Sequence, residues 1–169
     1  YDLALECLDV LRSAARAAGD RALQQEVAAY TKDVQRLKKA YAGVALYGRT
    51  LSENPNDGEA NRYVGLFRCT VKGDWDNGLQ QLARCDDEAL RGLAATDLSR
   101  PQDSGARLDL ANAWWTYSES QPVKDRSPIA LRGREWYLRA RPGLGVAARV
   151  DPDRRFSKIP LFADRIVIW

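Results

Sequence analysis

The side chains of this sequence that are best suited to bind a ligand are aromatic and cationic, and they gather in its second half. Trp114 and Trp115 are adjacent, so on a helix their side chains point about 100° apart and cannot both face the same core. Such rings either pack between helices or, beside cations, line a groove for a peptide or a sugar. Our candidate binding residues are Trp114, Trp115, Arg132, Trp136, Tyr137 and Arg139.

Positive charge is concentrated between Arg126 and Lys158. This segment contains eight arginines and one lysine against Glu135, Asp151 and Asp153, an excess of six positive charges, whereas the whole chain carries +3. The excess fits a solvated helix face, an acidic partner surface or contact with a nucleic-acid backbone. Because no nucleic-acid motif accompanies the charge, we do not expect nucleic acid to be the partner.

Catalytic side chains are scarce, since the sequence has no histidine. That absence excludes Ser-His and Cys-His nucleophile pairs and histidine-containing zinc sites. Cys7, Cys69 and Cys85 have no CxxC spacing and are expected to be reduced, although a Cys69–Cys85 disulfide stays open if their helices are antiparallel. Acidic pairs such as Asp74 and Asp76 are explained by helix capping. We therefore expect no catalytic residue, no metal, no cofactor and no enzyme activity.

Residues 1–52 predict a long helical hairpin. A helix over residues 1–17 is followed by Gly19 and Asp20, which are typical of a helix end and an N-cap. Residues 20–52 contain no proline, and their apolar residues follow the heptad pattern of a helix that needs partners along its length. Its far half packs either on the following helices or on a second copy of the chain. The heptad positions are Leu23, Val27, Tyr30, Val34, Leu37, Tyr41, Val44, Gly48 and Leu51.

Residues 53–142 predict further helical hairpins. Residues 54–58 and 99–105 are rich in the Asn, Asp, Gly and Pro that turns require. Pro128 suits the first turn of a helix, so we expect the last helix of this region to begin there. The expected helices span residues 59–71, 77–84, 86–98, 104–120 and about 128–142.

One of these hairpins resembles a tetratricopeptide repeat, a family in which an alanine, a Leu-Gly pair and a Gly-Asp-Tyr turn join two antiparallel helices. The segment between Gly65 and Gly73 is one residue longer than in the family, and Gly78 stands where the family prefers alanine. The resemblance implies stacked hairpins whose concave face holds a peptide or a neighbouring domain. The matching positions are Ala60, Val64, Gly65, Gly73, Asp74, Trp75, Leu79 and Leu82.

Residues 143–169 predict a basic linker rather than another hairpin. Residues 146–150 are expected to form at most one helical turn before Pro152. Residues 165–169 predict a short strand that either opens a following domain or folds back over the helices. The chain begins with Tyr1 and contains no methionine, so we expect it to be a piece of a longer protein. The order of its elements resembles helical modules of large modular bacterial proteins, which precede sugar-active or lectin-like domains.

The sequence therefore predicts an all-α fold of antiparallel helix hairpins in a tetratricopeptide-like array, with a long N-terminal hairpin and an irregular C-terminal tail. Apolar residues make up 45% of the chain and no apolar run is long enough to span a bilayer, so we expect no membrane partner. Our hypothesis is a non-catalytic scaffold that binds a protein, a peptide or neighbouring domains of its own chain. The alternatives are an accessory segment of a carbohydrate-active or lectin-like protein, and a homodimerisation module.

Overall fold

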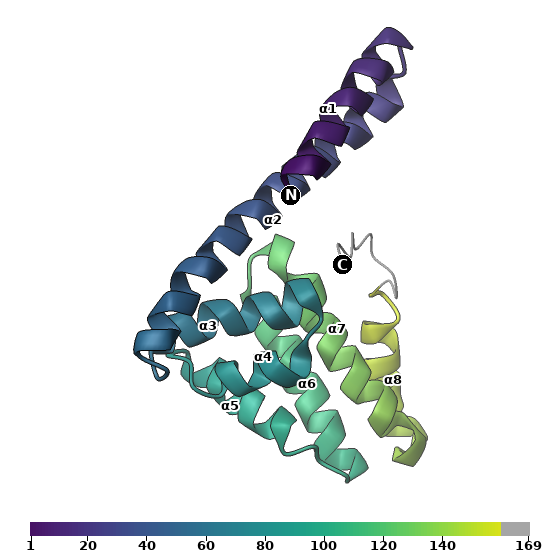
Figure 1. Ribbon diagram of the computed structural model, residues 1–169. Coiled ribbons are helices and arrows are strands. Elements are labelled where there is room, and N and C mark those ends of the chain that lie inside the picture. The colour runs from purple at the N-terminus through teal and green to yellow at the C-terminus, as the bar shows by residue number, and fades with distance from the viewer. Residues whose placement is uncertain (160–169) are drawn as a thin grey trace. The chain divides into compact units, whose positions relative to one another are not determined.

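The computed structural model describes residues 1–159, except the side chain of Lys124 (Figure 1). Over these residues the chain is all-α and contains no strand, which confirms the all-α part of the prediction. The chain forms two compact units, Tyr1–Arg49 and a second that begins at Thr50. The strand predicted over residues 165–169 lies outside the described residues. No helix of the described part is long and apolar enough to cross a membrane.

The first unit is a helical hairpin of α1 (Asp2–Ala17) and the N-terminal part of α2 (Arg21–Glu53). Gly19 has a φ of +67°, the left-handed conformation that glycine adopts easily at a helix end. Asp20 then caps α2, because its Oδ1 accepts a hydrogen bond from the backbone N–H of Leu23. Lys38 forms an ion pair with Asp2, so α1 runs antiparallel to α2 and begins beside the middle of that helix.

The second unit begins with a hairpin of α3 (Gly58–Phe67), the short π-helix η1 (Arg68–Lys72) and α4 (Trp75–Leu82). The single helix predicted over residues 59–71 therefore ends in a π-helical turn, whose hydrogen bonds span five residues instead of the four of an α-helix. Helices α3 and α4 approach closely at two glycines. A Cβ atom at Gly65 would lie 2.7 Å from Leu82 Cδ2, and one at Gly78 would collide with Cys69 Sγ.

The positions that resemble the tetratricopeptide pattern all lie in this hairpin. Five of them are buried, while the residues of the Gly-Asp-Trp turn are exposed or half-buried and connect η1 to α4. Gly73 has a φ of +70°, and the side chain of Asp74 caps α4 by accepting a hydrogen bond from the N–H of Asn77. The buried positions are Ala60, Val64, Gly65, Leu79 and Leu82.

The remaining helices are α5 (Glu88–Leu98), α6 (Ser104–Ser120), α7 (Val123–Ala140), the 3-10 turn η2 (Arg141–Gly143) and α8 (Val146–Phe156). Helices α6 and α7 lie along each other, and a Cβ atom at Gly133 of α7 would lie 2.8 Å from the carbonyl oxygen of Ala111 in α6. Helix α8 completes the unit, because Phe156 packs against Trp115 of α6 and Tyr137 of α7.

Two expectations about prolines were wrong. Helix α7 begins at Val123 and continues through Pro128, which we expected at its first turn. Helix α8 continues through Pro152 to Phe156, whereas we expected a basic linker with a single turn. An internal proline removes one helical hydrogen bond. Burial of neighbouring residues compensates that loss in both helices, since Ile129 beside the half-buried Pro128 is in the core, and both Pro152 and Phe156 are buried.

Candidate functional site

Asp97 is a buried carboxylate at the end of α5. It follows Leu90 and Ala94 at steps of four and three, so it lies on the stripe of α5 that faces the core. Only 1% of its surface is exposed. A carboxylate in such a place is stable only when hydrogen bonds and an opposite charge replace the lost water.

Three side chains from α6 and α7 supply those interactions. Asp97 Oδ2 accepts hydrogen bonds from the indole N–H groups of Trp114 and Trp136, both at 2.8 Å. The guanidinium of Arg132 donates from Nε to Oδ2 at 2.9 Å and from Nη2 to Oδ1 at 2.6 Å. We call these four residues the Asp97 cluster. It connects three helices through one carboxylate whose oxygens both accept hydrogen bonds.

Arg132 holds the outer side of the Asp97 cluster. Its Nη1 lies 2.8 Å from Glu135, and its guanidinium lies 4.9 Å from the centre of the Trp75 ring. Burial by itself would lower the pKa of Arg132, but its hydrogen bonds and charge interactions with Asp97 and Glu135 outweigh burial and raise that pKa. The cluster is therefore internally neutralised, and its geometry indicates a structural role.

Tyr137 lies outside the Asp97 cluster, and Arg139 lies at its edge. The hydroxyl of Tyr137 donates to Asp153 of α8 at 2.6 Å, and its ring stacks on Phe156 with centroids 5.3 Å apart. Burial and this hydrogen bond raise the pKa of Tyr137, whereas hydrogen bonds from Arg141 and Tyr137 lower the pKa of Asp153. Arg139 is exposed and lies over the Trp136 ring, 4.8 Å from its centre. Tyr137 thus attaches α8 to α7.

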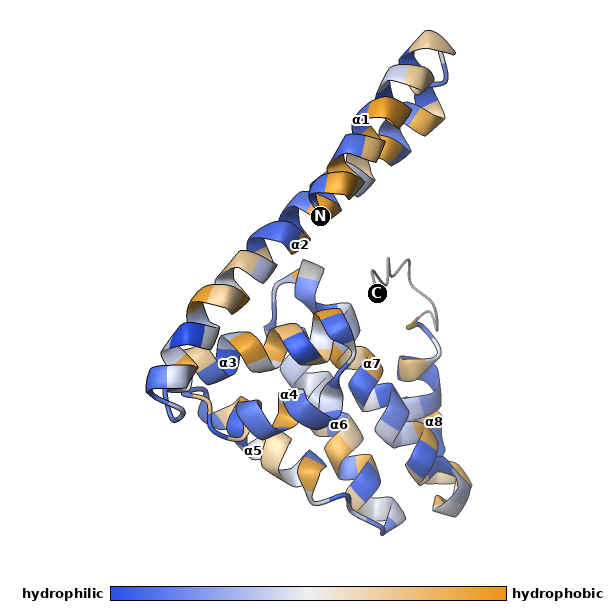
Figure 2. Ribbon diagram, in the orientation of Figure 1, coloured by the Kyte–Doolittle hydropathy of each residue, from blue (hydrophilic) through white to orange (hydrophobic). Residues whose placement is uncertain are grey.

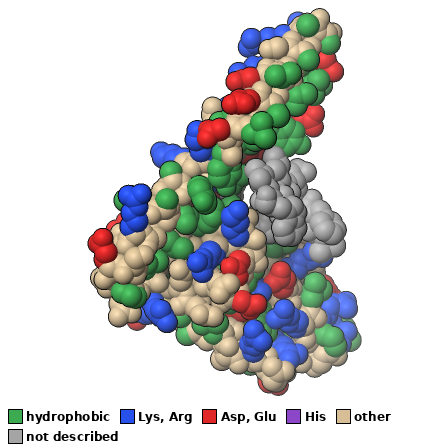
Figure 3. All heavy atoms as spheres, viewed as in Figure 1, with side chains coloured by type: hydrophobic (Ala, Val, Ile, Leu, Met, Phe, Trp, Pro, Cys, Tyr) green, Lys and Arg blue, Asp and Glu red, His purple; other side chains and the backbone are tan. Residues whose placement is uncertain are grey.

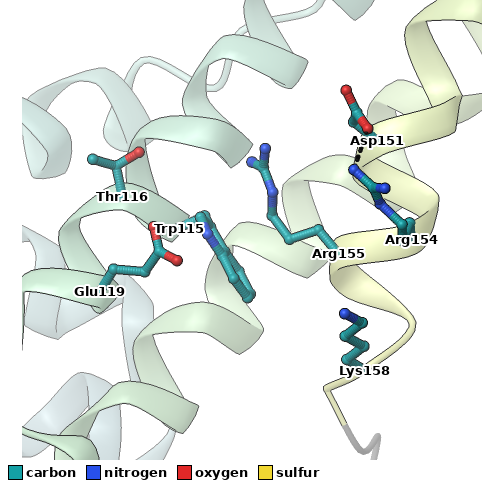
Figure 4. A pocket seen from close by; sticks show the side chains of 7 residues that line it. All are labelled: Trp115, Thr116, Glu119, Asp151, Arg154, Arg155 and Lys158. Carbon is teal, nitrogen blue, oxygen red and sulfur yellow. Dashed lines mark hydrogen bonds and ion pairs between the residues drawn. The ribbon is translucent and has the colours of Figure 1, made fainter.

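Trp115 lines a groove between α6 and α8, which we call the α6–α8 groove (Figure 4). The groove has a volume of about 510 Å³ and is open to solvent. The edge of the Trp115 ring meets Phe156 with centroids 5.5 Å apart, so this wall of the groove is fixed by the core beneath it. The lining consists of Trp115, Thr116 and Glu119 from α6, and Asp151, Arg154, Arg155 and Lys158 from α8 and the residues after it.

The charges of the α6–α8 groove are three cations against two carboxylates. Arg154 pairs with Asp151 at 2.7 Å, on the α8 side. Arg155 donates to the side-chain oxygen of Asn112 at 2.9 Å and lies 5.6 Å from the centre of the Trp115 ring. Among the described residues, Lys158 forms no ion pair. The groove therefore combines a half-buried aromatic wall with cations that face solvent.

The six candidate binding residues do not form one site. The structure brings Trp114, Arg132 and Trp136 together around Asp97, and it places only Trp115 in the α6–α8 groove. Sequence reasoning missed Asp97, although its position on the apolar stripe of α5 could have revealed it. It also missed the contribution of α8, because a proline-containing segment was interpreted as a linker. The missed groove residues are Thr116, Glu119, Asp151, Arg154, Arg155 and Lys158.

Within residues 1–159 no group of three or more Cys, Asp or Glu side chains is arranged to hold a metal ion. The three cysteines are free, with Cys7 exposed and both Cys69 and Cys85 buried. Burial raises the pKa of Cys69 to about 12 and also raises that of Cys85. Comparison of the chain with protein-family models, with curated proteins and with solved structures finds no match.

Proposed function

We propose that this chain is a non-catalytic helical protein-interaction module whose α6–α8 groove binds an acidic segment of a partner protein. The observation that supports the proposal is the groove itself, in which Trp115 forms one wall and Arg154, Arg155 and Lys158 offer positive charge. An aromatic ring beside guanidinium and ammonium groups binds peptide surfaces well, because it offers apolar area together with partners for carboxylates.

The form of the groove favours a peptide over other ligand classes. Small-molecule sites are usually enclosed and mostly apolar. The α6–α8 groove is instead open and polar, and Trp115 is the one aromatic residue among its described lining residues. Glu119 and Asp151 lie among its cations, and these carboxylates would repel the closely spaced phosphates of a nucleic acid. A peptide that mixes acidic and neutral residues can place its acids beside the cations and its neutral residues beside Glu119 and Asp151.

The resemblance to tetratricopeptide repeats belongs to the same proposal. It rests on one hairpin, α3 and α4, where its residues form glycine contacts and a Gly-Asp-Trp turn. The second hairpin is not a close copy of the first, because α6 and α7 have 17 and 18 residues whereas α3 and α4 have 10 and 8. The partner segment would belong to another protein or to a neighbouring domain of the same parent chain.

The test is a titration with a fluorescein-labelled peptide of alternating glutamate and serine, followed by anisotropy at low and at physiological salt. The double variant Arg154→Ala/Lys158→Ala should weaken binding by about 5- to 30-fold, since two exposed charge contacts contribute about 0.5–1 kcal/mol each. Binding should also weaken as salt increases, because the contacts are solvent-exposed.

The matched control is Lys72→Ala/Arg84→Ala, which removes the same charge from exposed positions of the same unit outside the groove. Both double variants remove two positive charges, so their net charges are equal. We expect the control to bind the peptide nearly as tightly as the parent chain does. Equal loss of affinity in both double variants would show that only general charge attracts the peptide, and it would contradict the groove assignment. If the parent chain does not bind the peptide at all, the groove assignment is contradicted as well.

The accessory segment of a carbohydrate-active or lectin-like protein is the second candidate. Trp115 supports it, because a half-buried aromatic ring next to carboxylates can stack on a sugar face while the acids accept hydroxyl hydrogens. A neutral oligosaccharide that binds in the same assay, and that loses affinity on Trp115→Ala, would favour this function over peptide binding.

A further inference from the structure

Arg155 is the cation of the α6–α8 groove that the fold holds in place without neutralising its charge. Its Nη1 donates to the side-chain oxygen of Asn112 at 2.9 Å, and its guanidinium lies 5.6 Å from the centre of the Trp115 ring. An amide oxygen orients a guanidinium but carries no negative charge. Arg154 differs, because Asp151 pairs with it at 2.7 Å. Among residues 1–159 Arg155 forms no ion pair, so its positive charge stays available to a ligand.

The core beneath the groove fixes the position of Arg155. Asn112 precedes Trp115 by three residues on α6, so both side chains lie on the side of α6 that faces α8. Phe156 directly follows Arg155 and is buried against Trp115. The burial of Phe156 sets the rotation of α8 about its axis, and it thereby sets the side on which Arg155 leaves that helix. Figure 4 shows the side chain of Arg155 reaching from α8 toward α6.

The Nε and Nη2 atoms of Arg155 form the edge that a ligand would meet. A guanidinium offers several N–H donors, and within the described residues Arg155 uses Nη1 for Asn112 and makes no other hydrogen bond. Neither Nε nor Nη2 is among the buried polar atoms that lack a partner, so both are reached by solvent. Two parallel N–H groups on one edge match the two oxygens of a carboxylate. An ammonium such as that of Lys158 is a point charge and does not impose this geometry.

The surroundings of Arg155 limit the acid to an isolated carboxylate. Glu119 lines the same groove from α6, is exposed and has no ion-pair partner among the described residues. A run of adjacent acids would bring a second carboxylate close to Glu119, whereas neutral neighbours avoid that repulsion. The wider surface also mixes both signs. Hydrophilic residues recur along α8 in Figure 2, and in Figure 3 Lys and Arg side chains gather over α7 and α8 with Asp and Glu side chains near them.

We infer that Arg155, positioned by Asn112 over Trp115, binds one side-chain carboxylate of the partner segment, and that neutral residues flank this acid. The inference rests on the proposed function, since it names the group that the α6–α8 groove holds and the residue that holds it. Asn112 is the positioning residue. It fixes the guanidinium before the ligand arrives, so less side-chain freedom is lost on binding. Arg154 and Lys158 then contribute general attraction, because the first is paired and the second is exposed.

The substitution Asn112→Asp separates this role from a structural one. The new carboxylate would pair with Arg155 and neutralise it. Affinity for the glutamate–serine peptide, amidated at its C terminus so that only side chains carry carboxylates, should fall by about 10- to 100-fold in the anisotropy assay. The urea midpoint should stay equal to that of the parent chain or rise, because the variant gains an ion pair.

Asn112→Ala should behave in the opposite way. It leaves the charge of Arg155 intact and removes only the group that holds it, so it should bind the peptide more tightly than Asn112→Asp does. It should also be less stable than Asn112→Asp, because it loses the hydrogen bond. A residue with a merely structural role would give the same order of the two variants in affinity and in stability.

Gln80→Glu is the matched control, since it adds the same negative charge at an exposed position of α4 outside the groove. It should bind the peptide within about 2-fold of the parent chain. Arg155→Lys keeps the positive charge but lacks the paired N–H edge, so it should weaken binding by about 10-fold. A peptide with the same number of glutamates in one run should bind more weakly than the alternating peptide.

The outcomes separate this inference from the proposed function. If Asn112→Asp and Arg155→Lys bind like Gln80→Glu while Arg154→Ala/Lys158→Ala loses affinity, the inference is overturned and the groove assignment stands. If the run of glutamates binds more tightly than the alternating peptide, the isolated carboxylate is wrong. If the parent chain does not bind the peptide, both the inference and the proposed function are contradicted.

Discussion

The substitution Asp97→Asn tests whether the Asp97 cluster holds the second unit together. It preserves the shape of the side chain but removes its charge and replaces one accepting oxygen by a donating NH₂ group. An amide oxygen at the Oδ2 position would keep the hydrogen bonds from Trp114, Trp136 and Arg132 Nε. The NH₂ group would then face Arg132 Nη2 at 2.6 Å, where two donors repel.

The expected cost follows from the burial of both charges. Asp97 is 1% exposed and the side chain of Arg132 is 11% exposed, so removal of the carboxylate leaves a nearly buried guanidinium with Glu135 as its remaining carboxylate. Loss of one partner of a buried ion pair costs about 3–5 kcal/mol. Domains are stable by only about 5–15 kcal/mol, so the variant should lose a large part of its free energy of unfolding.

Urea unfolding followed by tryptophan fluorescence measures this loss. The described tryptophans, Trp75, Trp114, Trp115 and Trp136, all belong to the second unit, so their emission reports on that unit. A loss below about 1 kcal/mol would refute the assignment, because it lies within the range of an exposed ion pair. The double variant Asp97→Asn/Arg132→Met should be more stable than the single one, since it removes the orphaned charge.

Three further predictions concern α6 and α7, α8, and the cysteines. Gly133→Ala should destabilise the second unit by about 1–3 kcal/mol in the same urea assay, because its Cβ would meet a backbone oxygen at 2.8 Å, while Gly92→Ala, with open space around it, should be neutral or stabilising. The pKa of Asp153 lies below its unfolded value of 3.8, so its contribution is present above that pH and is lost as pH falls through the lower folded value. Asp153→Asn should therefore reduce the fall in Tm below about pH 4. With a disulfide reagent at neutral pH, Cys7 should react first and Cys69, whose pKa is about 12, should react only on unfolding; rapid reaction of more than one thiol would contradict the burial.

Local sequence signals predicted much of the helical architecture. Asp20 and Asp74 were expected to cap helices and both do, and the side chains of Asp57, Asp87 and Asp103 cap three further helices in the same way. The heptad pattern of residues 20–52 predicted the long helix, which the structure has as α2. These features depend on neighbours within one or two turns, so the sequence contains them directly.

Features that depend on tertiary burial could not be predicted in the same way. We expected a helix to begin at Pro128 and a helical turn to end before Pro152, because proline is disfavoured inside a helix. Packing of Ile129 and Phe156 outweighs that preference, and only the folded unit reveals it. The α6–α8 groove likewise exists only because residues 146–156 form α8. From the sequence, the cations of this segment could be recognised as an excess of positive charge, but not as one surface.

Two features of the candidate site illustrate this limit. The adjacent Trp114 and Trp115 were expected to face different surroundings, and the structure places Trp114 on the buried Asp97 and Trp115 on the open groove. The sequence could not determine which of the two would be buried. That choice depends on Asp97, which lies 17 residues away from Trp114 in the chain and meets it only after α5 and α6 have packed.

The most direct test of the proposed interaction module is an NMR titration of the indole N–H signals with the glutamate–serine peptide. We predict that the Trp115 signal shifts progressively and saturates, because its ring lines the α6–α8 groove. The signals of Trp114 and Trp136 should stay in place, since both N–H groups are held by the buried Asp97. A Trp115 signal that does not move, or one that moves equally with a lysine–serine peptide, would contradict the account.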